Sequence, residues 1–160
     1  MDSMKIAIGS DASGLELKRT VIQHLKETGH EVVDHGYVPE TEDTAQYSAT
    51  YANKVAHSIL DGTAERGVLI CGTGIGISIS ANKVRGIRAA VCSEPFTARH
   101  TRENNGSQII AFGAFVVGPD MAKSIVDEFL GATFKGETDA EYVERFQKIA
   151  AIEDEQYAAS

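Results

Sequence analysis

The chain has 160 residues, of which 42% are hydrophobic and 24% charged, and its formal net charge is −8. This length favours a single domain with a substantial buried core. The acidic balance argues against a nucleic-acid-binding protein, because neutralising phosphate groups requires a basic surface.

Membrane association and disulfide bonding are not expected either. No apolar stretch approaches the roughly 20 residues that a membrane span requires, and the first residues lack the apolar core of a signal peptide. The two cysteines, Cys71 and Cys92, are too few for a disulfide framework. We therefore predict a cytoplasmic protein with reduced thiols and no membrane partner.

Short apolar runs alternate along the chain with longer segments of helical periodicity. In chain order, the pattern predicts a strand at 5–10, a helix at 15–28, a strand at 31–34, a loop at 36–46, a helix at 47–60, a strand at 67–70, a helix at 74–83, a strand at 87–91, a helix at 96–104, a strand at 108–112 and helices at 119–130 and 140–157.

Strands that alternate with helices in this way pair in parallel, and continuous apolar strands indicate a sheet buried on both faces. The predicted fold is a single doubly wound, Rossmann-like α/β domain over residues 1–160. It has a five-stranded parallel sheet with helices on both faces, a core at residues 4–130 and a C-terminal helical extension at residues 131–160.

Ligands of open parallel sheets bind beyond the carboxyl ends of the strands. Three predicted strand ends carry polar or glycine-rich turns: Ser10-Asp11, Cys71-Gly72-Thr73-Gly74 and Cys92-Ser93-Glu94. The second turn also opens a helix, whose free backbone N–H groups suit a phosphate or an oxyanion.

Cys71 ends a strand beside a glycine turn and a helix N-terminus, an environment that favours the thiolate form of a cysteine. A free cysteine also packs well as a small buried hydrophobe, and this is the preferred interpretation of Cys92. Asp11 is sufficiently explained as a helix cap. The glycine pattern G-x-G-x-G is not the dinucleotide fingerprint and no P-loop is present, which leaves a nucleotide-binding protein as the weakest alternative.

The histidines lack the spacing of metal ligands, so no metal is expected. His24, His30 and His57 are predicted to be solvated. The acidic C-terminal helix is predicted to be a solvated face whose few apolar side chains pack on the body or on a second subunit.

The chain resembles the family of ribose-5-phosphate isomerase type B, which includes galactose-6-phosphate isomerase subunits. The resemblance rests on residues 4–9 followed by Asp11, on Leu-Ile-Cys-Gly-Thr-Gly-Ile-Gly-Ile-Ser-Ile-Ser-Ala-Asn-Lys at 69–83, on Gly-Ile-Arg-Ala-Ala at 86–90 and on Gln-Ile-Ile-Ala-Phe-Gly-Ala at 108–114. It implies a cofactor-independent aldose–ketose isomerase that acts on a sugar phosphate through a cis-enediolate. It also implies a homodimer or tetramer in which the neighbouring subunit completes each site.

By this resemblance Cys71 is the base, Thr73 assists ring opening or holds a hydroxyl group, and backbone N–H groups of the glycine turn stabilise the enediolate oxygen. The implied catalytic residues are Cys71, Thr73 and Asn104. The implied substrate-binding residues are Ser10, Asp11, Ala12, Tyr51, Gly72, Gly74, Ile75, Gly76, Asn105 and Arg145.

The chain departs from the family pattern where the far end of the substrate would bind. Ala12 replaces a histidine, Asn104 replaces the ring-opening histidine, and Phe115 replaces an arginine. Glu141 and Tyr142 stand where an arginine and a histidine are expected, and of the basic positions only Arg145 remains.

Ribose 5-phosphate and ribulose 5-phosphate are the default substrate pair. Two hypotheses could explain the lost basic residues. In the first, other basic residues of this chain hold the phosphate; in the second, the substrate is a tetrulose phosphate, another short sugar phosphate or a free sugar. A noncatalytic sugar-phosphate-binding subunit is a further alternative. The basic residues available for a phosphate are Arg99, Arg102, Lys135 and Arg145.

Overall fold

The structure is a computed structural model that describes residues 1–160. Its centre is a five-stranded sheet in which every pair of neighbours is parallel, with the strand order β2-β1-β3-β5-β4. The predicted fold class is therefore confirmed. The strands are β1 (Lys5–Ser10), β2 (Glu31–Asp34), β3 (Arg66–Cys71), β4 (Ala89–Val91) and β5 (Ile109–Gly113).

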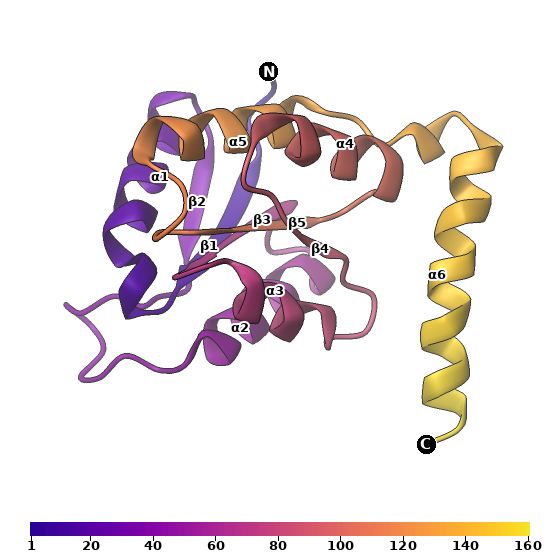
Figure 1. Cartoon of the computed structure of the whole chain (residues 1–160), viewed down its shortest axis with the longest axis horizontal. Helices are drawn as coiled ribbons and strands as arrows, with labels where there is room; N and C mark the ends of the chain where they lie inside the picture. The colour runs from indigo at the N-terminus through magenta and orange to yellow at the C-terminus, as the bar shows by residue number, and fades with distance from the viewer.

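Helices cover both faces of the sheet (Figure 1). Helices α1, α4 and α5 pack on one face and helices α2 and α3 on the other. The α-helices are α1 (Leu15–Glu27), α2 (Ser48–Leu60), α3 (Ile75–Asn82), α4 (Pro95–Asn105), α5 (Pro119–Gly131) and α6 (Ala140–Ala158), and two short 3₁₀ helices lie at η1 (Ala12–Gly14) and η2 (Lys135–Glu137).

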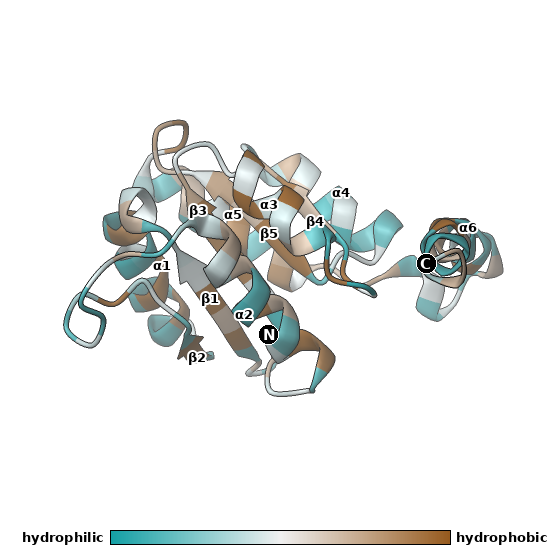
Figure 2. Cartoon of the chain, turned by 90° about the horizontal axis from the view of Figure 1, so that it is seen from below, coloured by the Kyte–Doolittle hydropathy of each residue, from teal (hydrophilic) through white to brown (hydrophobic).

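The period-two alternation of the strands divides the core into two parts. Ile6 and Ile8 of β1 face the core under α1, α4 and α5, and Ala7 between them faces the core under α2 and α3. Figure 2 shows mostly hydrophobic strands between helices that carry both hydrophilic and hydrophobic residues. A sheet buried on both faces explains why the strand sequences are continuously apolar.

Strand β4 is shorter than the predicted strand at 87–91. The N–H of Ile87 is bound to the carbonyl of Val84 in a turn, which keeps this residue out of the sheet. The side chain of Asn82 then binds both the N–H and the carbonyl of Ala89, at 2.8 Å each, where the strand begins. The other predicted elements agree with the observed ones to within one residue at each end.

The chain leaves β1 toward β2 on one side and places β3 on the other side, so β1 and β3 form the point where the strand order reverses. Ser10 at the end of β1 pairs with Ile70 near the end of β3. The helices that follow these two strands lie on opposite faces. Such a switch point leaves a crevice for ligands at the carboxyl edge.

Helix α6 extends away from the body of the molecule (Figures 1 and 2), and none of its residues is buried. It contacts the loop between α3 and β4. Arg85 pairs with Asp154 at 2.6 Å, and the N–H of Gly86 binds the carboxylate of Glu153 at 3.0 Å. No helix in the structure is both long and apolar enough to cross a membrane.

Two side chains outside the site bear on the sequence predictions. Cys92 is buried in the core, as predicted, and burial raises the pKa of its thiol to about 11. The prediction that His30 is solvated is wrong. His30 is buried because its Nδ1 accepts a hydrogen bond from the N–H of Met4, which closes the start of β1.

Candidate active site

The Cys71 side chain lies at the carboxyl edge of the sheet, at the last residue of β3 and directly before the turn that opens α3. It is 6% exposed, and its Sγ accepts a hydrogen bond from the backbone N–H of Gly74 at 3.1 Å. The thiol therefore has a fixed position at the N-terminus of a helix.

Glycine is required in this turn by geometry. Gly74 has φ +82°, a left-handed conformation, and a Cβ at this position would lie 2.7 Å from Cα of Phe112. At the end of β5, a Cβ on Gly113 would lie 2.5 Å from the carbonyl oxygen of Gly72. The turn and the end of β5 consequently approach more closely than residues with side chains allow.

Two more groups of the turn face the same edge. The hydroxyl of Thr73 accepts a hydrogen bond from the N–H of Ile75 at 3.2 Å and so caps the start of α3. The N–H of Gly76 has no hydrogen-bond partner in the chain. A free N–H in the first turn of a helix is available to bind an anionic oxygen.

The turn after β1 contributes a carboxylate to this edge. One oxygen of Asp11, Oδ1, accepts hydrogen bonds from the Ser13 hydroxyl at 2.6 Å and from the N–H of Gly14 at 3.2 Å, which is the predicted capping role. Its other oxygen has no such bond. Ala12 is exposed beside it, whereas Ser10 is fully buried and its hydroxyl has no partner.

Tyr51 has no exposed surface in this structure, although it is one of the expected substrate-binding residues. Its hydroxyl donates to Glu42 at 2.8 Å and accepts from the N–H of Gln46 at 3.0 Å. Tyr51 therefore holds the loop between β2 and α2 in place. This geometry does not support a direct contact between its hydroxyl and a substrate.

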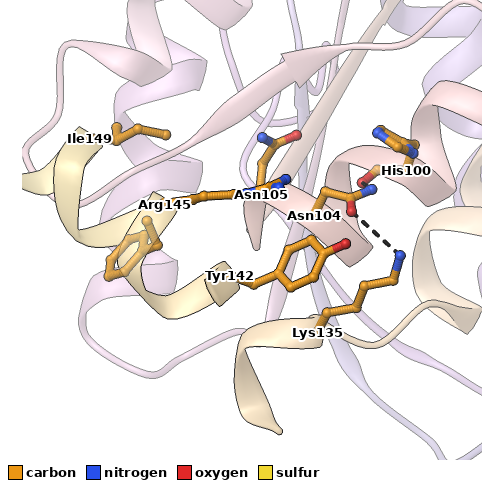
Figure 3. Close-up of a pocket in the computed structure, with 8 residues that line it drawn as sticks. His100, Asn104, Asn105, Lys135, Tyr142, Arg145 and Ile149 are labelled. Atoms are coloured by element: carbon orange, nitrogen blue, oxygen red, sulfur yellow. Dashed lines mark hydrogen bonds between the residues drawn. The ribbon is translucent and has the colours of Figure 1, made fainter. Parts of the chain in front are cut away.

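The remaining expected residues, Asn104, Asn105 and Arg145, lie elsewhere. They belong to a pocket of about 390 Å³ between the C-terminal end of α4 and the start of α6 (Figure 3). Five of its eight lining residues are polar or charged and three are hydrophobic. Its lining residues are His100, Asn104, Asn105, Lys135, Tyr142, Arg145, Phe146 and Ile149.

Cations gather around one aromatic ring in this pocket. Lys135 and Arg145 lie 5.3 Å and 5.0 Å from the centroid of Tyr142. Lys135 also donates to the side-chain oxygen of Asn104 at 3.4 Å, the contact drawn in Figure 3. Arg145 is paired with Glu141 on its own helix. The sequence indicated Lys135 as a possible phosphate ligand, but it gave no reason to consider His100.

This pocket and Cys71 lie at opposite edges of the sheet within one chain. Asn105 precedes β5, and the N–H of Gly67, at the start of β3, binds the carbonyl of Gln108 in the segment that follows Asn105. Cys71 is at the other end of β3 and pairs with Gly113 at the end of β5. Cys71 lies four residue steps along the strand from Gly67, which corresponds to about 13 Å.

The two edges also differ in charge. The loops that follow the five strands, residues 11–14, 35–47, 72–74, 92–94 and 114–118, contain no lysine or arginine. The edge that carries Cys71 therefore offers hydrogen-bond donors and a carboxylate but no loop cation. Cations lie at the opposite edge, where burial lowers the pKa of Arg66 and Arg88 and lowers that of Arg102 to about 10.

Phe115 forms an apolar wall beside the glycine turn. Its N–H binds the carbonyl of Gly72 at 3.0 Å, and its ring would lie 2.6 Å from a Cβ on Gly72. The side chain is 78% exposed. Exposed apolar side chains continue around this edge, at Ile75, Ile79, Phe96 and Val116.

No three His, Cys, Asp or Glu side chains gather in a way that could hold a metal ion. The fold is a doubly wound α/β sheet, and at its switch point this edge holds a buried thiol at a helix N-terminus beside a glycine turn.

The model of the Ribose/Galactose Isomerase family matches residues 6–149. The chain is 46% identical over 150 residues to ribose-5-phosphate isomerase B of Escherichia coli, covering 93% of this chain and 96% of that protein. It is 44% identical over 142 residues to D-erythrulose-4-phosphate isomerase of Pectobacterium atrosepticum, covering 89% and 92%. The solved structure of Clostridium thermocellum ribose-5-phosphate isomerase B superposes with a TM-score of 0.88 at 44% identity, covering 96% of this chain and 99% of that one.

The chain belongs to the Ribose/Galactose Isomerase family. It is an enzyme of the aldose–ketose isomerase kind that acts on sugar phosphates.

Proposed function

We propose that the protein interconverts an aldose phosphate and its ketose phosphate through a cis-enediolate, with Cys71 as the base. The Cys71 thiolate takes the proton from C2 of the aldose and returns it to C1, and one proton moves from the C2 hydroxyl to the C1 oxygen. The C1 carbonyl becomes an alcohol and C2 becomes the carbonyl. The hydrogens only change place within the molecule, so the reaction needs no oxidant or reductant.

The observation that carries this proposal is the hydrogen bond from the N–H of Gly74 to Sγ of Cys71 at 3.1 Å. It fixes the sulfur at the N-terminus of α3, in a defined position from which a base could act. The free N–H of Gly76 would bind the enediolate oxygen, where a fixed donor stabilises the developing charge. Thr73 and the free oxygen of Asp11 are suited to bind substrate hydroxyl groups.

The phosphate group requires cations that the loops at the Cys71 edge do not contain. Lys135 and Arg145 are such cations, but they lie at the opposite edge, and a five-carbon sugar phosphate spans only roughly 8 Å from C1 to phosphorus at covalent bond lengths. We therefore propose a homodimer in which the pocket of one chain completes the Cys71 site of the other. In a two-fold dimer this exchange occurs twice.

Exposed apolar side chains around Cys71 support the same arrangement. Phe115 is 78% exposed, Phe96 63% and Ile75 54%. Apolar groups clustered at one edge favour contact with another protein surface. A second copy of this chain would cover them and exclude water from the enediolate.

Ribose 5-phosphate and ribulose 5-phosphate are the proposed substrate pair, which would place the enzyme in pentose phosphate metabolism. A reducing compartment such as the cytoplasm suits the proposed base, because both cysteines are free thiols.

One observation favours a second candidate, D-erythrulose 4-phosphate, the substrate in the name of the Pectobacterium relative. Asn104 occupies the pocket position at which a ring-opening acid or base would be expected, and its amide does not titrate near neutrality. An aldotetrose whose C4 oxygen carries phosphate cannot close a furanose ring on that oxygen. Such a substrate needs no ring-opening group.

Two experiments test the proposal. The variant Cys71→Ser is expected to lose about 10²-fold or more in kcat for the best of the four-, five- and six-carbon sugar phosphates. Cys92→Ser, which alters the other thiol, buried in the core under α4 and α5, serves as the control. Full activity in Cys71→Ser would eliminate Cys71 as the base.

The composite site is tested by mixing Cys71→Ser chains with Arg145→Ala chains at low substrate concentration. A mixed dimer has one intact site, and half of randomly paired dimers are mixed, so activity should recover to about a quarter of the wild-type value. No recovery after verified exchange of subunits would show that Cys71 and Arg145 act from the same chain or do not share a site.

A further inference from the structure

Arg88 contacts both walls of the pocket in Figure 3, although it does not line the pocket itself. On the α4 side, its Nε donates to the carbonyl of Asn105 at 3.0 Å and its Nη2 donates to the carbonyl of Gly106 at 2.9 Å. On the α6 side, its guanidinium lies 4.2 Å from the centroid of the Phe146 ring. Phe146 directly follows Arg145.

The backbone around Arg88 is itself held in place. The N–H of Arg88 binds the side-chain oxygen of Gln108 at 2.9 Å, and the amide nitrogen of the same side chain binds the carbonyl of Gly86 at 2.8 Å. Asn82 binds both backbone groups of the next residue, Ala89. The guanidinium therefore extends from a fixed point of the body.

Helix α6 is held near the pocket by a small number of exposed contacts, since none of its residues is buried. Lys135 of η2 lies 5.3 Å from the centroid of the Tyr142 ring, and Arg88 of the α3–β4 loop lies over the Phe146 ring. The contacts of Arg85 with Asp154 and the Tyr157 ring, and of Gly86 with Glu153, lie two turns or more further along the helix. A cation stacked on an aromatic ring and partly withdrawn from water contributes more than an exposed one.

The two carbonyls that Arg88 binds lie at the end of α4, directly after Asn104. They are the last acceptors of α4, which ends at Asn105 and leaves through Gly106 with φ +60°. Arg102 donates to the same Gly106 carbonyl at 3.2 Å. Cations at a helix C-terminus stabilise its unpaired carbonyls.

We propose that Arg88 is a positioning residue for the phosphate group. It sets the distance between the α4 wall, with Asn104 and Asn105, and the α6 wall, with Arg145. This inference rests on the proposed role of the pocket in binding phosphate and adds a residue that does not touch the substrate. Its loss would loosen phosphate binding and leave the Cys71 chemistry unchanged once substrate is bound.

The test compares three variants by steady-state kinetics and by inhibition with inorganic phosphate. For Arg88→Met, we expect KM for the sugar phosphate and the inhibition constant of phosphate both to rise about tenfold, with kcat within twofold of wild type. Arg88→Lys keeps the charge but cannot make both carbonyl bonds from a planar group, so its effect should be intermediate. Arg85→Met is the matched control, because Arg85 also docks α6 but far from the pocket.

A purely structural role for Arg88 predicts a different result. Loss of folded protein lowers the apparent kcat and leaves the phosphate inhibition constant unchanged, and the thermal unfolding midpoint of each variant reports such a loss directly. Equal effects of Arg85→Met and Arg88→Met on KM, or a fall in kcat alone, would overturn the proposal. If Arg88→Met does not fold, the same test is made with Arg88→Lys, by its KM for the sugar phosphate and its inhibition constant for phosphate.

The variant Arg145→Ala separates this inference from the proposed function. If phosphate inhibition is unchanged in Arg145→Ala, the pocket is not the phosphate site, and the proposed function fails at that point together with the inference. If Arg145→Ala weakens phosphate inhibition and Arg88→Met does not, only the role of Arg88 is wrong.

Discussion

The backbone N–H of Gly74 donates a hydrogen bond to Sγ of Cys71 at 3.1 Å, across a turn that ends one strand and begins a helix. The left-handed conformation of Gly74 directs this N–H toward the sulfur. The conformation of one glycine therefore determines the electrostatic environment of the proposed base.

Replacing Gly74 with alanine should destabilise the fold and reduce activity. Alanine in a left-handed conformation costs about 1 kcal/mol, and its Cβ would lie 2.7 Å from Cα of Phe112, an overlap that adds about 2 kcal/mol. Gly62→Ala is the control, because Gly62 has φ +78° but open space around it. In urea unfolding, the free energy of unfolding should fall about three times as much in Gly74→Ala as in Gly62→Ala. Equal losses would mean that the contact with Phe112 relaxes freely.

Replacing Phe115 with arginine should improve the use of longer sugar phosphates. The variant introduces a cation among loops that contain none, beside the glycine turn. We expect KM for ribose 5-phosphate to fall several-fold, by roughly 1 kcal/mol of added charge-assisted binding, while KM for D-erythrulose 4-phosphate changes less. Phe115→Leu keeps the wall apolar and should leave the ratio of the two KM values unchanged. A change of that ratio in Phe115→Leu would assign the effect to shape instead of charge.

The ion pair of Lys18 and Asp34 should be sensitive to removal of either partner. Lys18 is 1% exposed, and its Nζ donates to Asp34 at 2.6 Å and to the carbonyl of Tyr37 at 2.8 Å. Asp34→Asn leaves a buried ammonium group without its anion and should lower the free energy of unfolding by about 3 kcal/mol. The double variant Lys18→Met with Asp34→Asn should recover part of this loss. If the double variant is less stable than Asp34→Asn, the unpaired ammonium group is not the origin of the stability lost in Asp34→Asn.

An exposed ion pair provides the comparison for Lys18. Arg19 pairs with Glu40 at 2.7 Å, and both side chains are about half exposed or more. Arg19→Met should change the free energy of unfolding by less than about 1 kcal/mol, because solvent screens such pairs.

Alkaline pH should destabilise the protein through Cys92. Burial raises the pKa of its thiol from 9.0 to about 11, so between these values the folded state holds a proton that the unfolded state releases. Stability is therefore fully present below pH 9 and decreases as the pH rises to about 11, by roughly 2 kcal/mol. Urea unfolding at several pH values would measure this slope. Cys92→Ala should be less stable at neutral pH but should lose the slope, and an unchanged slope would assign it to another group.

Much of the Cys71 edge could be predicted from the sequence because its determinants are local. Cys71, the turn through Gly74 and the helix that begins at Ile75 are consecutive, so a strand end, a turn and a helix N-terminus follow from short-range pattern alone. The alternation of apolar strands and helices likewise predicted a parallel sheet covered on both faces. The resemblance added the proposed roles of these residues.

Only the tertiary structure decided which residues share an edge. The sequence suggested one set of site residues, whereas Asn104 and Asn105 end the helix before β5 and lie one strand length from Cys71, which ends β3 at the opposite edge. The packing of whole elements brings Arg145 of α6 to the same pocket as these asparagines, and no local pattern encodes such long-range contacts. For the same reason, the burial of Tyr51 and the contacts of Arg88 with two helices distant in sequence emerged only from the folded chain.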